Sequence, residues 1–256
     1  MKPIAKVYTA IIFLFLFAPI AILLVFSFNS GNSLSVFSGF SLYWYKELFQ
    51  DSNTLEALRN TLVLALCAAI LSTVLGTAAS VGMNKLRSKY MRAAMNTVTN
   101  LPMVNPEIIT GISLMMLFVA YQRFASELDF LPGNIMGFPT LLIAHIAFNV
   151  PYVIFNVTPK LKQLDIKLFE AALDLGCTPI QAFFKVVIHE IMPGIISGAM
   201  MAFTMSLDDF VISYFVYGPQ FVTLPVEIYN YTKKPLQPKI YALFTLLFLI
   251  LLAAMI

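Results

Sequence analysis

The chain has 256 residues, of which 59% are hydrophobic and only 11% are charged, and its formal net charge at pH 7 is +3. A soluble domain carries about 25% charged residues, so this chain has too little polar surface to cover a globule in water. The composition excludes a soluble protein and predicts an integral membrane protein surrounded by membrane lipid. The small net charge gives no reason to expect a nucleic-acid partner.

Six apolar runs are long enough to cross a bilayer, which takes roughly 20 residues of helix. Backbone polar groups in lipid must be satisfied within their own segment, so the runs predict helices, and their weak period-two alternation argues against a β-barrel. The expected fold class is an all-α polytopic membrane protein with one transmembrane domain over residues 1–256. Its six spans cover about residues 8–28, 61–83, 101–121, 138–157, 191–217 and 240–256.

The first span could be mistaken for a secretory signal, because Lys2 and Lys6 precede it. The run over residues 8–28 is longer than the roughly 7–15 apolar residues of a signal peptide, and no small-x-small cleavage site clearly follows. We therefore expect a retained span.

The Lys and Arg residues predict which side each loop faces, because cytoplasmic loops carry an excess of them. Ten lie at the amino terminus and in the loops after the second and fourth spans: Lys2, Lys6, Lys85, Arg87, Lys89, Arg92, Lys160, Lys162, Lys167 and Lys185. Six lie in the other loops: Lys46, Arg59, Arg123, Lys233, Lys234 and Lys239. The bias predicts that both termini and the loop over residues 159–190 are cytoplasmic.

The loop over residues 159–190 predicts two short helices joined at Gly176, which stands where a left-handed helix terminus favours glycine. Thr178 is expected to cap the second helix, with Pro179 at its first position and Gln181 closing a capping box. Apolar residues recur at the spacing of one helical face: Leu161, Leu164, Leu168, Ala171 or Ala172, and Leu175. Such a segment either rests on lipid headgroups or docks a cytosolic partner.

Within this loop, Glu170-Ala171-Ala172 is followed after three residues by Gly176, which resembles the EAA loop of ABC importer permeases. The resemblance extends to GFSLYWYKELF at residues 39–49, NPEIITGISL in the third span and SLDDFVISYFVYGP in the fifth. Together these segments look like the C-type permease of bacterial spermidine/putrescine importers. The family pattern ends in I-x-L-P, whereas here that stretch reads VVIH, so a different entry of the fifth span into the membrane is expected.

The resemblance implies the six-helix fold of MetI-like ABC importer permeases in a bacterial inner membrane. It implies four kinds of partner, namely a homologous permease subunit, two ATPase subunits, an external substrate-binding protein and a polyamine substrate. Glu170, Ala171, Ala172 and Gly176 would couple the chain to the ATPases. The chain itself has no GxxxxGK phosphate-binding loop, so we expect no enzymatic activity and no cofactor.

Asp208 and Asp209 lie side by side in the fifth span, where removing a carboxylate from water is costly. They serve either as polar contacts to neighbouring helices or as a cation-attracting site in the translocation path, where carboxylates would compensate ammonium groups for lost hydration. Adjacent residues on a helix point about 100° apart. We therefore expect one aspartate to face the path and the other to face protein, without a choice between them.

Two further polar residues lie in the predicted spans, and each allows two interpretations. Glu107 follows Asn105-Pro106, so it is either an acid favoured by the dipole at a helix start or a second cation contact. His145 in the fourth span is expected to be an interhelical hydrogen-bond partner rather than a proton relay.

Three other functions each share one feature with this chain. An intramembrane aspartyl protease also buries two aspartates, but it needs them to converge from separate helices. His189-Glu190 begins like the HExxH zinc motif, but Pro193 replaces its second histidine, so no metal site is expected. A secondary cation transporter also places carboxylates on an ion path, but the EAA loop argues against it; an ABC permease for another small cation or a metal ion is the remaining alternative.

Overall fold

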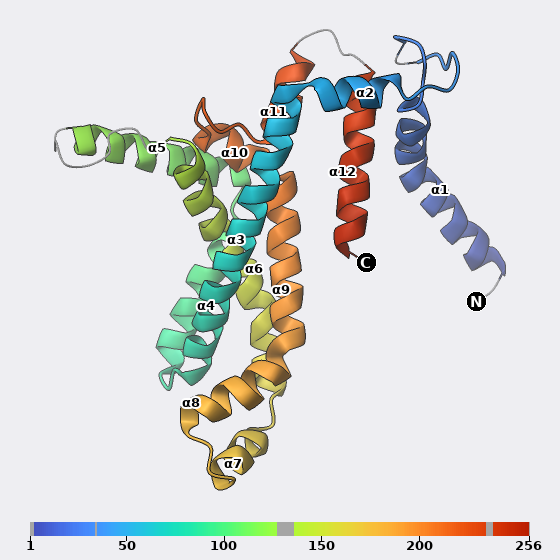
Figure 1. Ribbon diagram of the computed structural model, residues 1–256. Coiled ribbons are helices and arrows are strands. Elements are labelled where there is room, and N and C mark those ends of the chain that lie inside the picture. Colours follow the sequence, from blue (N-terminus) through green and yellow to red (C-terminus); the bar gives the residue numbers. More distant parts are fainter. Residues whose placement is uncertain (1–2, 34, 127–135, 234–237, 256) are drawn as a thin grey trace. The chain divides into compact units, whose positions relative to one another are not determined.

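The computed structural model describes residues 3–33, 35–126, 136–233 and 238–255 (Figure 1). Lys2, Lys234 and the last residue of the sixth predicted span lie outside these residues. Regular structure in the described ranges is helical, apart from isolated bridges at Asn29–Phe40 and Gly218–Phe221, which confirms the all-α prediction. The helices are α1 Pro3–Phe26, α2 Tyr43–Gln50, α3 Ser52–Lys85, α4 Lys89–Val104, α5 Glu107–Ser126, α6 Phe138–Gln163, α7 Ile166–Asp174, α8 Pro179–Ala182, the π-helical turn η1 Phe183–Val187, α9 Ile188–Asp208, α10 Val211–Val216, α11 Leu224–Thr232 and α12 Lys239–Met255.

Among the described residues, five helical segments are long and apolar enough to cross a membrane, and a shorter apolar helix runs over Lys239–Ile250. The five segments are Val7–Phe26, Ser52–Lys85, Glu107–Ser126, Phe138–Gln163 and Pro179–Asp208. Contacts between residues divide the chain into two compact units, Met1–Leu58 with Glu227–Ile256, and Arg59–Val226. Each unit is described by itself.

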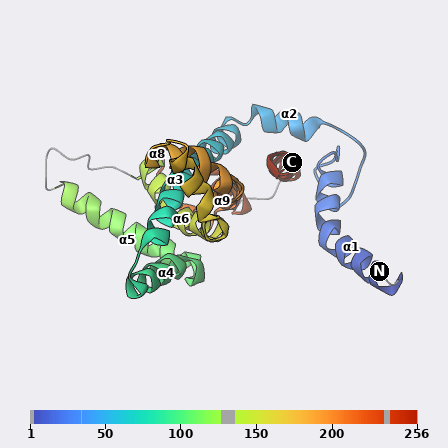
Figure 2. The same ribbon diagram turned by 90° about the horizontal axis from the view of Figure 1, so that it is seen from below.

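In the first unit, α12 packs against both α1 and α2 (Figure 2). Phe26 at the end of α1 meets Tyr241 of α12 edge to face, with ring centroids 6.1 Å apart. On α2 the side chains of Trp44 and Leu48 are buried. Asp51 follows α2 directly and accepts hydrogen bonds from residues before and within α12, so the unit is tied together by both apolar and polar contacts.

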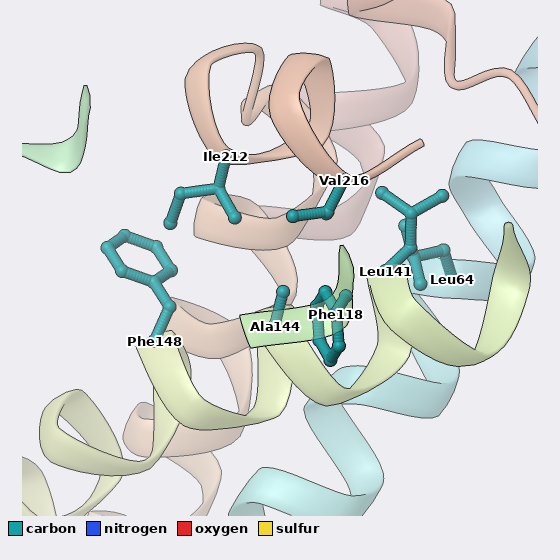
Figure 3. Close-up of a cluster of buried hydrophobic side chains, with 7 residues drawn as sticks. All are labelled: Leu64, Phe118, Leu141, Ala144, Phe148, Ile212 and Val216. Atoms are coloured by element: carbon teal, nitrogen blue, oxygen red, sulfur yellow. The ribbon is translucent and has the colours of Figure 1, made fainter. Parts of the chain in front are cut away.

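In the second unit, α6 is the central helix. One apolar cluster joins α3, α5, α6 and α10 (Figure 3): Leu64, Phe118, Leu141, Ala144, Phe148, Ile212 and Val216. A second cluster extends along α6 and α9 and includes Val153, Val157 and Ile191. Gly76 allows α3 to approach α6 closely, because a Cβ atom added there would lie 2.7 Å from the Val153 side chain.

Two of the predicted spans are broken in the structure. In the third, α4 ends at Val104 and α5 begins at Glu107, because Asn105 is held extended before Pro106. In the fifth, α9 ends at Asp208, Asp209 has extended backbone angles, and α10 begins at Val211. The expected 100° offset between the two aspartates requires one continuous helix, so that expectation is wrong.

Candidate functional site

Residues 166–182, here called the elbow, comprise α7, the turn at Gly176 and α8. Gly176 has a φ of +86°, in the left-handed region. Its N–H donates to the Leu173 carbonyl over 2.9 Å, and the Cys177 N–H donates to the Ala172 carbonyl over 3.1 Å. These two bonds form a Schellman motif, which satisfies carbonyls that the helix end would otherwise leave unpaired. The predicted glycine terminus is confirmed.

The second half of the elbow is also capped as predicted. The Gln181 N–H donates to Thr178 Oγ1 over 3.4 Å, and the Thr178 N–H donates to Gln181 Oε1 over 3.0 Å, with Pro179 in the first turn. Asp165 caps the start of α7, because its carboxylate accepts a hydrogen bond from the Lys167 N–H. Short local patterns therefore fix both helices of the elbow, which Figure 1 shows at one end of the α6–α9 pair.

The single apolar face predicted for the loop is wrong in part. Leu161 belongs to α6 and is buried, whereas Leu168 and Leu175 lie in or beside α7 and are exposed, Leu175 by 86%. The face is interrupted because α6 ends at Gln163, which resets the helical register. Ile180 is also exposed, as is Phe184 in the adjoining η1, so the elbow presents an apolar surface to its surroundings.

The four predicted coupling residues share this elbow. Glu170 and Ala171 are exposed on α7, while Ala172 is buried. Within the described residues, a Cβ atom added at Gly176 would meet no atom within 4 Å, so glycine is needed there for its backbone conformation rather than for space. The VVIH stretch continues the helix without a break, running from η1 into α9.

The two aspartates have different surroundings. Asp208 is the last residue of α9 and is exposed, whereas Asp209 is 8% exposed. The Asp209 carboxylate accepts from the N–H groups of Ile212, over 3.2 Å, and Ser213, over 2.7 Å. It therefore occupies the N-terminus of α10, where backbone donors and the helix dipole compensate its negative charge.

Glu107 lies close enough to interact electrostatically with both Asp208 and Asp209. It is exposed at the first residue of α5, a helix that packs against α10. At this contact a Cβ atom added to Gly111 would lie 3.4 Å from Ile212 Cα. The packing of α5 on α10 thus brings Glu107 to the two adjacent aspartates at the end of α9, and Tyr152 on α6 lies within electrostatic range of Glu107. We refer to Glu107, Asp208 and Asp209 as the acidic cluster.

A groove of about 750 Å³ lies where α4 bends into α5. The residues that line it come before and after Glu107 in the sequence. Its lining is mainly apolar, with a few polar side chains: Asn105, Thr110 and Ser113. Small-molecule sites commonly combine such surfaces. The groove was not predicted, because a bend brings together residues that the sequence separates.

His145 lies beside the acidic cluster and is 1% exposed. Its Nδ1 lies 2.6 Å from Ser206 Oγ, and its Nε2 lies 3.0 Å from Ser213 Oγ and 3.5 Å from Asp209 Oδ2. The predicted role as an interhelical hydrogen-bond partner is confirmed. The two serines were not predicted, although their positions one helical turn before and after Asp209 were a usable signal.

Comparison with known proteins adds an independent observation. The family described as "Binding-protein-dependent transport system inner membrane component" matches residues 72–256. The putrescine transport system permease protein PotI of Escherichia coli (strain K12) is 40% identical over 238 residues, covering 92% of this chain and 82% of the relative. The spermidine/putrescine transport system permease protein PotC of the same strain is 33% identical over 245 residues, covering 96% and 88%.

Solved structures of importers share the fold. A bacterial ABC transporter involved in the import of the acidic polysaccharide alginate superposes with a TM-score of 0.74 at 17% identity, covering 98% of this chain and 92% of that one. The MetNI methionine ABC transporter gives a TM-score of 0.61 at 17% identity, covering 78% and 90%. These likenesses confirm the predicted MetI-like permease fold.

Proposed function

The chain belongs to the family of binding-protein-dependent transport system inner membrane components, and from that premise we propose that it carries polyamines as the permease subunit of an ATP-driven importer. The chain is a multi-pass membrane permease rather than an enzyme. In the proposed assembly it pairs with a homologous permease, the two permeases bind two ATPase subunits at the cytoplasmic face, and an external binding protein delivers the substrate. Both termini lie on the cytoplasmic side.

The convergence of the acidic cluster carries the substrate proposal. Putrescine and spermidine are flexible chains of methylene groups with two or three ammonium groups. Glu107 and Asp208 are exposed and lie within electrostatic range of each other, so each can pair with an ammonium group. The apolar groove beside Glu107 suits the methylene groups. Two relatives whose names contain putrescine or spermidine support the same substrate class.

The elbow is the proposed contact with the ATPases. Its exposed apolar side chains, including Leu175 and Ile180, suit a groove on a cytosolic partner. The elbow continues through η1 into α9, whose 21 residues extend roughly 30 Å and end at Asp208. ATP-driven closure of the ATPases would displace the elbow and therefore move Asp208. This movement would change the access of the substrate to the acidic cluster.

The experiment that tests the substrate proposal compares Asp208→Asn with Glu56→Gln, an exposed acid on α3 outside the acidic cluster. Each variant is assembled with the partner permease, the ATPases and the binding protein in proteoliposomes, and uptake of labelled putrescine and spermidine is measured per assembled complex. We expect Asp208→Asn to lose most uptake and Glu56→Gln to retain it. Equal uptake in the two variants would contradict a substrate contact at Asp208.

A further inference from the structure

His145 contacts both sides of the break between α9 and α10. Ser206 lies in the last turn of α9 and Ser213 in the first turn of α10, and one imidazole ring reaches both hydroxyls. We infer that His145 is a positioning residue: it fixes the angle between α9 and α10, and thereby the separation of the Glu107 and Asp208 carboxylates. The consequence for transport rests on the proposed polyamine function, whereas the geometric claim does not.

The contacts around His145 form a closed buried network. His145, Ser206, Ser213 and Asp209 are all buried, so a side chain left without a partner among them would be costly. A neutral imidazole has one N–H donor and one acceptor nitrogen. The Asp209 carboxylate oxygen, 3.5 Å from Nε2, favours the proton at that nitrogen. Nε2 then donates toward α10, and Nδ1 accepts from the hydroxyl of Ser206 on α9.

This network spans a point where the backbone itself gives little support. The Asp209 carboxylate caps α10 through the N–H groups of Ile212 and Ser213, so it holds the start of α10. Ser206 supplies the α9 side of the contact with His145. Because α6 packs against both α9 and α10 and contributes to both apolar clusters, it provides the frame to which the two helices are tied.

The angle at the break sets the separation of the two exposed acids. Glu107 begins α5, which packs on α10 through Gly111, so its position follows α10. Asp208 ends α9, so its position follows α9. A rotation of α10 about the break therefore changes the distance between the two carboxylates. Two ammonium groups joined by a short methylene chain need that distance to be constant, because misplaced contacts lose binding and rate steeply.

The test measures the separation directly. Glu107→Cys and Asp208→Cys are introduced together after Cys67 and Cys177 are replaced by serine, and cross-linking of the assembled complex by bifunctional thiol reagents of increasing length is timed. The same pair is then combined with His145→Leu, His145→Gln and His145→Asn. The Gln amide reaches about as far as Nε2 and the Asn amide about as far as Nδ1, so Gln can keep the bonds to α10 while Asn cannot.

We expect His145→Leu and His145→Asn to slow cross-linking by the optimal reagent roughly ten-fold and to broaden the range of effective lengths. His145→Gln should restore the rate in part, because its amide can keep the bonds to α10 but not the bond to Ser206 on α9. The control is Thr158→Val, which removes a hydroxyl of α6 that bonds Ser80 on α3, away from α10; its cross-linking should equal that of the parent pair. Equal rates in all His145 variants, or a Gln variant as slow as Leu, would overturn the inference.

A second variant tests the inference even where the complex with His145→Leu does not assemble. Ser213→Ala keeps the imidazole but removes its hydroxyl partner on α10, so it should slow cross-linking in the same direction; an unchanged rate would overturn the inference. Uptake distinguishes this result from a failure of the proposed function. If His145 variants alter cross-linking while Asp208→Asn transports polyamine normally, the positioning role holds and the polyamine site does not.

Discussion

Lys239 Nζ donates to the Asp51 carboxylate over 2.8 Å, although the residues lie 188 positions apart in the sequence. Tyr231 and Thr54 donate their hydroxyls to the same Oδ2 atom, each over 2.9 Å. Partial burial of Asp51 disfavours its charged form, but these bonds outweigh that cost and lower its pKa from the ordinary 3.8 to about 2. The bonds therefore join α2 and α12 within the first unit.

This ion pair predicts an acid-dependent loss of stability. Since the folded pKa of Asp51 lies below its ordinary value, the stabilisation is present above about pH 4 and is lost as the pH falls through about 2. Asp51→Asn should cost about 1 kcal/mol near pH 6, because the pair is partly exposed to solvent. In thermal unfolding of the purified protein, the difference from wild type should shrink between pH 4 and pH 2. A constant difference across that range would show that the carboxylate charge is not responsible.

The two aspartates should respond differently to truncation. Asp209→Ala removes the cap of α10 and leaves its first N–H groups unpaired, so we expect a loss of about 1–2 kcal/mol in stability and less assembled complex. Asp208→Ala removes an exposed carboxylate and should leave thermal unfolding unchanged while uptake per complex falls. Thermal unfolding and uptake of the same preparations separate these outcomes. Equal stability of both variants would argue against the capping role of Asp209.

Gly176 offers a test of the elbow that does not depend on packing. Gly176→Ala places a side chain at a φ of +86°, which costs roughly 1–2 kcal/mol, and this should distort the turn between α7 and α8. Gly82→Ala is a matched control, because an added Cβ atom meets no described atom within 4 Å at either position and only Gly176 has positive φ. We expect Gly176→Ala to lower the polyamine transported per ATP hydrolysed. Unchanged coupling would contradict the docking role.

The contact between α3 and α6 should be intolerant of added volume. Gly76→Ala would place a Cβ atom 2.7 Å from the Val153 side chain, which is fully buried and cannot move freely. Overpacking of this kind costs about 1–3 kcal/mol. Thermal unfolding should show the loss for Gly76→Ala and not for Gly82→Ala, which lies on the same helix. Similar melting of the two variants would mean that the helices separate easily at this point.

The parts of the structure that could be predicted are those fixed by neighbouring residues. Thr178, Pro179 and Gln181 form their cap within one turn, and Gly176 ends α7 through bonds to carbonyls a few residues away. Apolar runs likewise identify spanning helices, because the lipid environment requires helical hydrogen bonding. The resemblance of the elbow and of the acidic segments also identified the family.

The parts that could not be predicted depend on contacts between distant segments. The break after Asp208 arises because Asp209 caps α10 while His145, from another helix, binds serines on both sides. Glu107 meets the aspartates only because α5 packs on α10. The end of α6 at Gln163 divides the apolar pattern that helical spacing alone predicts as one face. None of these packing relationships follows from helical periodicity.

The most direct test of the account compares uptake by the chain alone with uptake by the full assembly. Proteoliposomes would contain either the purified chain, or the chain with its partner permease, the ATPases and the loaded binding protein, each with and without internal ATP. The account predicts accumulation of labelled polyamine only in the full assembly with hydrolysable ATP. Solute uptake by the chain alone, without an ATPase, would contradict it.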